Sequence, residues 1–141
     1  MKTRWFSLLK LNKFSFGEQI VFQLVVFECK YLFSIIFFYF PKSDKKQDRY
    51  HTHAFKAISI KLFGQYTEYL LNDCPITGWT FSQKNRTEIF KYIPKNHFHS
   101  IGNSTGCMTL LLSGPWGKTW KEMIVKDRLV KYYTWGREPN D

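Results

Sequence analysis

Residues 51–68 read HTHAFKAISIKLFGQYTE, and this stretch decides which fold the sequence favours. Three apolar residues in its middle, Ile58, Ile60 and Leu62, alternate with polar ones, and a period of two is typical of a half-buried strand. Gly64 then permits a turn or a bulge, because glycine has no Cβ and adopts backbone conformations that other residues avoid. Strand character resumes after it. The stretch therefore predicts two consecutive β-strands.

The rest of the chain shows the same character. Residues 3–12 predict a short amphipathic helix or an irregular lead-in, residues 42–49 predict a solvated polar connector, and the segment from Glu122 to Asp141 gives no readable pattern. About seven to nine short strands with regularly spaced turns indicate a β-sandwich or a small barrel. The clearest strands are expected over residues 14–27, 31–40, 50–63, 65–71, 87–93 and 108–113.

Composition narrows the class of protein. A chain of 141 residues is long enough for one domain with a real core. Aromatic residues make up 19% of it, as 14 Phe, 8 Tyr and 5 Trp, and such stiff side chains fit pleated sheets better than helices. The net charge of +10, from 21 Lys and Arg against 11 Asp and Glu, favours an anionic partner such as a nucleotide, a nucleic acid, a phosphorylated metabolite or a membrane surface. Solubility alone explains this charge equally well.

Cysteine usage and hydropathy bear on the compartment. Cys29, Cys74 and Cys107 are widely spaced and form no CxxC motif, so we expect neither a zinc ribbon nor a disulfide framework. A reducing cytoplasm is the simplest setting for such a chain. Residues 20–40 approach the length of a membrane span, but a glutamine, a glutamate and a lysine interrupt them. We therefore expect two buried strands there and no membrane association.

All four histidines occur in two His-x-His pairs, His51 with His53 and His97 with His99. On a strand, side chains two residues apart point to the same face, so each pair can present two imidazoles side by side. Neutral imidazole suits Fe, Ni, Cu and Zn. A single such pair is usually an exposed strand surface, but two pairs that use every histidine favour a metal site.

The spacing around both pairs resembles the cupin motifs. His51 and His53 followed by Gly64 match the first motif, which is HxH, three or four residues, Glu, six residues and Gly. Residues 94–103, PKNHFHSIGN, resemble the second motif, PxGxxHxxxN, with Asn96 in place of its glycine. More narrowly, the chain resembles a small, largely uncharacterised single-domain cupin family with an RmlC-like jelly roll, found in phage and bacterial genomes. The residues that carry this narrower resemblance are Ser59, Ile60, Leu62, Gly64, Tyr66, Glu68, His99, Ile101, Thr109, Leu110, Gly114, Pro115 and Trp120.

This resemblance implies a fold and a division of the chain. The fold is all-β, a cupin or jelly-roll type of double-stranded β-barrel with short N-terminal and C-terminal extensions. Residues 1–30 would form the N-terminal extension with the first strands, residues 31–120 the barrel core, and residues 121–141 the C-terminal extension.

The resemblance also implies three metal ligands that face the barrel interior, His51, His53 and His99, for a divalent ion such as Fe, Mn, Ni or Zn. The glutamate of the first motif falls on Ala57 here, or on Ile58 with the longer spacing, and neither side chain can bind a metal. Three neutral ligands leave the metal its full charge and open positions for water, O₂ or an anionic ligand. A cupin barrel that has lost its metal is the alternative.

Two further residues are candidates for this site. Glu68 lies on the next predicted strand and could replace the missing carboxylate ligand, or it could be an exposed strand residue. His97 could be a fourth ligand, a catalytic base that moves protons near neutral pH, or a loop residue.

Two functions follow from these patterns. The first is a metal-dependent cupin enzyme that acts on a small anionic substrate by oxygenation, isomerisation or hydrolysis. The second is a non-catalytic protein that binds and sequesters an anionic small molecule such as a nucleotide. Nucleic-acid binding is not favoured, and a homodimer that buries residues 20–40 is a further candidate. The side chains that could bind the anion or its ring are Arg49, Lys61, Arg86, Lys91 and Trp116.

Overall fold

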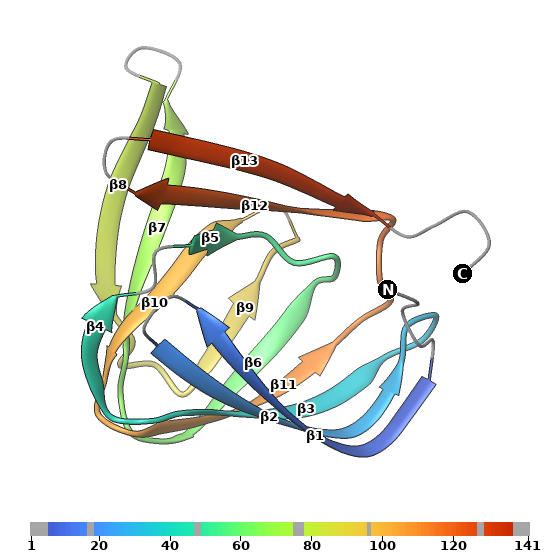
Figure 1. Ribbon diagram of the computed structural model, residues 1–141. Helices are drawn as coiled ribbons and strands as arrows, with labels where there is room; N and C mark the ends of the chain where they lie inside the picture. The colour runs from blue at the N-terminus through green and yellow to red at the C-terminus, as the bar shows by residue number, and fades with distance from the viewer. Residues whose placement is uncertain are drawn as a thin grey trace.

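The computed structural model describes residues 6–16, 19–46, 49–74, 78–95, 97–126 and 129–136. All regular secondary structure within these residues is β-strand. The strands form two antiparallel sheets that surround a common interior (Figure 1). The first sheet has six strands in the spatial order β1 (Phe6–Phe16), β2 (Gln19–Cys29), β3 (Ser34–Phe40), β11 (Cys107–Ser113), β6 (Ala57–Phe63) and β9 (Phe90–Ile93). The second sheet has seven strands, ordered β13 (Leu129–Gly136), β12 (Thr119–Lys126), β5 (Arg49–His51), β10 (Phe98–Ser104), β7 (Thr67–Cys74) and β8 (Gly78–Asn85), with β4 (Ser43–Lys46) paired to β10.

The stretch from residue 51 to residue 68 folds as its pattern predicts. It contributes β6 to the first sheet and the start of β7 to the second, so it crosses from one sheet to the other. Gly64 joins the two strands with φ of +77°, and a Cβ there would collide with the carbonyl oxygen of Gly106 and lie 2.7 Å from the Cα of Cys107. Only glycine tolerates both conditions, so the turn that changes sheets depends on it.

The sequence predicted a short helix or an irregular lead-in over residues 3–12, and both alternatives are wrong for the described part of this range. Residues 6–16 form neither a helix nor an irregular lead-in but β1, which pairs with β2 from Phe6 opposite Cys29 to Phe16 opposite Gln19. The polar connector expected over residues 42–49 also contains a short strand, β4, which pairs with β10. In both places a neighbouring strand offers a row of backbone hydrogen-bonding groups, and pairing with it outweighs the weak local preference of the segment.

The unassigned C-terminal segment completes the second sheet. β12 pairs with β13 from Thr119 opposite Gly136 to Lys126 opposite Leu129. β12 also pairs with β5, where Glu122 lies opposite His51. Strands from residue ranges 1–30, 31–120 and 121–141 thus share the two sheets, and the described chain has thirteen strands rather than about nine.

The core lies between the two sheets. The inner faces contribute two main apolar clusters, one around Val25, Ile36 and Leu111 and one around Val21 and Phe40. The candidate histidines meet these clusters from the second sheet, because His51 ends β5 and lies directly opposite His99 of β10. Among the described residues no helix is long and apolar enough to cross a membrane.

The outer face of the six-stranded sheet is apolar as well. Strand register aligns a row of side chains across the whole sheet, from Leu11 on β1 through Leu24, Phe37, Leu110 and Ile60 to Phe90 on β9. Leu11 is 72% exposed and Phe90 is 68% exposed. We call the exposed members of this surface the outer apolar face: Leu11, Ile20, Leu24, Ile58, Phe90, Tyr92 and Leu112.

Candidate metal centre

Three of the four histidines meet inside the protein. His51 and His99 face each other across the β5–β10 pair, and His53 follows β5 in the segment that leads to β6. Ring centroids lie 4.7 Å apart for His51 and His99, 4.9 Å for His53 and His99, and 5.0 Å for His51 and His53. One ring nitrogen from each lies within 4.8 Å of the others, a grouping that could hold a metal ion. The two histidine pairs therefore converge, although 46 residues separate His53 from His99.

A buried glutamate fixes the orientation of His99. Nδ1 of His99 lies 2.8 Å from Oε1 of Glu68, and a carboxylate only accepts, so Nδ1 carries the proton and donates it. Nε2 of His99 then has a free lone pair and accepts a hydrogen bond from Nε2 of His53, at 2.8 Å. Glu68 thus lies behind the ligand atoms rather than among them, the position that carboxylates commonly occupy behind metal-bound histidines.

A lysine balances the charge of this glutamate. Nζ of Lys91 forms an ion pair with Oε2 of Glu68, and the carboxylate side chain is only 5% exposed. Burial lowers the pKa of Lys91 to about 8, so its ammonium group still carries a charge at pH 7. Glu68 and Lys91 therefore form a neutral buried pair behind His99.

Burial keeps the three histidines neutral. It lowers the pKa of His51 to about 4, against a smaller opposing effect of Glu122. It also lowers the pKa of His53 and of His99 well below the usual value, and the neighbouring histidines and Lys91 add to the effect. At pH 7 each imidazole is uncharged and keeps a lone pair for a metal ion.

These residues fit a divalent metal ion by the chemistry of their donors. Three neutral imidazoles with a carboxylate behind one of them suit Fe, Mn, Ni or Zn. Ala57, at the position of the first-motif glutamate, has no donor atom and lies buried in the apolar core. The histidine cluster accordingly supports a divalent-metal site with three protein ligands.

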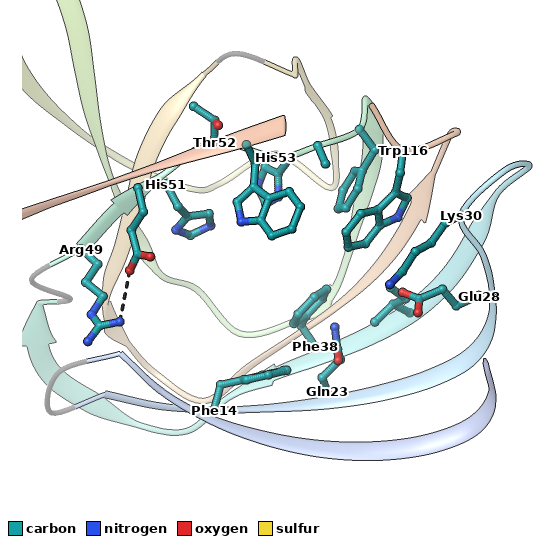
Figure 2. Close-up of a pocket in the computed structure, with 15 residues that line it drawn as sticks. Phe14, Gln23, Glu28, Lys30, Phe38, Arg49, His51, Thr52, His53 and Trp116 are labelled. Carbon is teal, nitrogen blue, oxygen red and sulfur yellow. Dashed lines mark hydrogen bonds and ion pairs between the residues drawn. The ribbon is translucent and has the colours of Figure 1, made fainter. Parts of the chain in front are cut away.

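Two cavities adjoin the cluster. The larger, of about 460 Å³, is lined by His51 and His53 together with aromatic side chains such as Phe38 and Trp116 (Figure 2). Lys30 reaches it too, with Nζ 4.6 Å from the ring centroid of Trp116. The smaller cavity, of about 90 Å³, lies deeper between the sheets and is lined by all three clustered histidines.

The other predicted binding residues lie in different surroundings. Arg49 and Trp116 line the larger cavity, and Nη1 of Arg49 donates to Oε1 of Glu122 at 3.1 Å. Nζ of Lys61 donates to the backbone carbonyls of Arg86 and Thr87. Lys91 is held by Glu68, as described above. Which of these residues contacts a ligand stays a prediction.

His97 lies just before β10 rather than on it. Its ring centroid is 6.2 Å from that of His99, and it does not belong to the group of three converging nitrogen atoms. Burial lowers its pKa, with a further contribution from Lys91. Its predicted role as a base or as a fourth ligand stays a prediction.

Three residues around the cavities received no role from the sequence. Tyr66 lies two residues before Glu68 on the chain, so extending the period of two back from Glu68 would have identified it. Glu122 and Lys30 line the larger cavity. Glu122 lies in the segment without a readable pattern, and Lys30 looked only like an interruption of an apolar run, so neither carried a local signal.

No protein-family model matches the sequence, and neither does any curated protein. Solved structures match the fold. Oxalate decarboxylase from Bacillus subtilis has a TM-score of 0.52 at 11% identity, over 82% of this chain and 30% of its own. The capsular polysaccharide assembling protein CapF from Staphylococcus aureus has a TM-score of 0.51 at 10% identity, over 88% of this chain and 31% of its own. The 7S globulin of Momordica charantia has a TM-score of 0.51 at 7% identity, over 82% of this chain and 36% of its own.

These neighbours are cupin-fold proteins, so the fold of this chain is cupin-like, as its motifs predicted. The chain spans about a third of the length of each neighbour, from 30% to 36%. The double-stranded barrel consists here of two antiparallel sheets that are not closed into one. Among the neighbours, the oxalate decarboxylase has Mn(II) centres.

Proposed function

We propose that this cupin-like protein binds a divalent metal ion through His51, His53 and His99. The metal ion binds a small anionic ligand, which the protein converts if it is an enzyme. One observation carries the proposal: three uncharged imidazoles with nitrogen atoms within 4.8 Å of one another form part of the wall of a cavity. The net charge of +10 also favours an anion.

A divalent ion on three neutral ligands would supply a full double positive charge and Lewis acidity to the cavity. The residues of this chain supply the rest. Glu68 holds the proton of His99 on Nδ1, so that Nε2 faces the cluster. Aromatic side chains such as Phe38 and Trp116 line the larger cavity next to the cluster. As a metal-dependent enzyme the protein would catalyse an oxygenation, an isomerisation or a hydrolysis.

Metal analysis of protein purified without an affinity tag tests this proposal. After addition of Fe(II), Mn(II), Ni(II) or Zn(II), we expect about one equivalent of metal per chain in the wild type and loss of it in His99→Ala. Glu88→Gln, a substitution in a surface ion pair, is the control and should keep its metal. His97→Ala tests the predicted fourth ligand: retained metal restricts the site to the three clustered histidines, and loss of metal adds His97 to it. Less than about a tenth of an equivalent in the wild type would overturn the proposal.

The larger cavity supports a second candidate, a protein that binds a nucleotide without converting it. Trp116 and Trp120 line this cavity, with ring centroids 5.8 Å apart, and aromatic rings of this kind stack on bases. A thermal-shift screen of nucleotides tests this function, because a ligand that binds only the folded state raises Tm. The shift should persist in His51→Ala and disappear in Trp116→Ala. If no nucleotide raises Tm, this function is excluded.

The outer apolar face supports a homodimer. Six strands at about 4.8 Å spacing and about seven residues at about 3.3 Å rise give a surface of roughly 600 Å², close to the roughly 800 Å² that each partner buries in a standard interface. A second copy presents the same apolar face, and a two-fold dimer buries both at once. Light scattering after size exclusion should give the mass of a dimer for the wild type and of a monomer for Leu112→Lys. Leu32→Lys, in the turn between β2 and β3, changes an exposed leucine off this face and should stay dimeric. A monomeric wild type would exclude the dimer.

Three finer statements complete the proposal. They are a cytoplasmic location, membership of the small phage and bacterial cupin family, and the division of the chain at residues 30 and 120.

A further inference from the structure

A buried arginine, Arg86, contacts two residues of the wall of the smaller cavity, Ser59 and Tyr66. Arg86 is only 1% exposed, and its guanidinium group forms no ion pair with any residue that the structure describes. Its hydrogen bonds go to neutral oxygen atoms: Nη1 donates to Oγ of Ser59 at 2.7 Å and to the hydroxyl of Tyr66 at 2.8 Å. Nη2 donates to two backbone carbonyls, at 2.7 Å on Ser59 and 3.2 Å on Ile89. A positive charge is therefore buried there without a negative partner.

The two hydroxyl groups on Arg86 both belong to the wall of the smaller cavity. Ser59 and Tyr66 line it together with the three clustered histidines. Each hydroxyl oxygen accepts a hydrogen bond from Nη1 of Arg86, so its own proton must point away from the guanidinium group. A hydroxyl group that accepts from a cation is polarised and becomes a stronger donor. The wall of the cavity thus includes two polarised O–H donors as well as the histidine cluster.

The charge inside the barrel is unbalanced in a way that an anion would correct. Glu68 is already neutralised by Lys91, whereas nothing described neutralises Arg86. Burying an uncompensated charge is costly, and an anionic oxygen within reach of the polarised hydroxyls would reduce that cost. A cavity of about 90 Å³ has room for a carboxylate group and not for a nucleotide.

We propose that Ser59 and Tyr66, polarised by Arg86, bind a carboxylate of the ligand while a second oxygen of the same molecule lies at the histidine cluster. The ligand class is a small carboxylic acid with a second anionic or polar oxygen, such as a dicarboxylate. This inference rests on the proposed function, because it takes the histidine cluster to hold the metal ion. Arg86 is a positioning residue here, since it acts through the two hydroxyls.

Titration calorimetry of the Mn(II)-loaded protein with malonate and succinate tests the inference. We expect millimolar or tighter binding of at least one of them to the wild type. Tyr66→Phe should weaken it about 10- to 100-fold, because it removes one hydrogen bond to a charged group from a buried site. Tyr69→Phe is the matched control: its hydroxyl accepts a hydrogen bond of 2.9 Å from Asn103 but does not line the cavity, so binding should change less than about twofold.

Manganese content and Tm, measured on each variant, separate the two proposals. Failure of the wild type to bind Mn(II) overturns the proposed function. Normal Mn(II) content with no binding of either dicarboxylate overturns the present inference alone, and so does equal binding by wild type and Tyr66→Phe. If Tyr66→Phe fails to fold, Ser59→Ala replaces it, because it removes the second donor with little change of volume. Weaker dicarboxylate binding at unchanged Mn(II) content supports the inference.

Discussion

The interior of the barrel contains two buried polar groups that differ in charge balance. In the first, Glu68 accepts from His99 and pairs with Lys91, so a negative and a positive charge offset each other. In the second, Arg86 donates to Ser59 and Tyr66, and among the described residues no carboxylate pairs with it. Both groups adjoin the same small cavity.

This difference assigns a separate task to each side of the cavity. The Glu68–Lys91 pair has little net charge, so burial is the largest effect on the pKa of the neighbouring histidines. The imidazoles therefore remain neutral donors for a metal ion. Arg86 produces a positive potential that no described carboxylate offsets. The hydroxyl protons of Ser59 and Tyr66 extend this potential into the cavity. Under the two proposals above, the same fold would provide a cation-binding side at the histidines and an anion-binding side at Ser59 and Tyr66.

The strongest test of this comparison removes the negative charge of Glu68. Glu68→Gln keeps the size of the side chain but leaves Lys91 buried without a carboxylate, and breaking a buried pair in this way costs about 3–5 kcal/mol. The variant also loses the acceptor that fixes the tautomer of His99, so metal affinity should fall about 10- to 100-fold. Denaturant unfolding and metal titration measure the two effects.

Glu88→Gln is the control for this substitution. Glu88 pairs with Lys84 at 3.5 Å on the surface, and exposed pairs of this kind contribute little stability. We expect no measurable change of metal affinity in Glu88→Gln. Equal effects of the two substitutions would mean that the charge balance behind His99 does not matter.

Acid should destabilise the metal-free protein through the histidine cluster. The pKa of His51 is about 4 in the folded protein and about 6.5 in an unfolded chain, so between these values only the unfolded chain binds the proton. The contribution is fully present above about pH 6.5 and is lost as the pH falls towards 4, by at most about 3 kcal/mol for this residue.

Thermal unfolding at a series of pH values checks this expectation. Tm of the metal-free wild type should decrease from pH 6.5 to pH 4, and His51→Gln should show a flatter profile because glutamine does not titrate. Profiles of equal slope would show that His51 does not stay neutral in the folded state.

The sequence predicted the cation-binding side far better than the anion-binding side. A period of two placed His51 and His53 side by side, and the resemblance to the second cupin motif implied His99 as the third member of the cluster. The all-β fold and the turn at Gly64 followed from similarly local rules. Such features are readable because they depend on residues that are close in the chain.

The contacts that tune the site depend on pairing register and on tertiary burial, which the sequence does not display. Glu68 reaches His99 because β7 and β10 pair with Leu70 opposite His99, a register that no single strand specifies. Arg86 was among the basic residues predicted to contact the anion, but its burial, with only 1% of the residue exposed, could not be predicted from its polar neighbours in the chain. His97 lies one residue before β10, so the regular alternation of a strand does not by itself place its side chain relative to His99.

The smallest expected effect on stability is that of replacing Arg86. Arg86→Met removes several hydrogen bonds but also removes a buried charge that lacks a partner, so the two contributions oppose each other and we expect a net loss of only about 1–2 kcal/mol. This contrasts with Glu68→Gln, in which the substitution creates an uncompensated charge instead of removing one. Denaturant unfolding of both variants at pH 7 gives the comparison directly. A larger loss for Arg86→Met than for Glu68→Gln would show that Arg86 is neutralised in the folded protein, and the positive potential that directs a carboxylate to Ser59 and Tyr66 would then have no source.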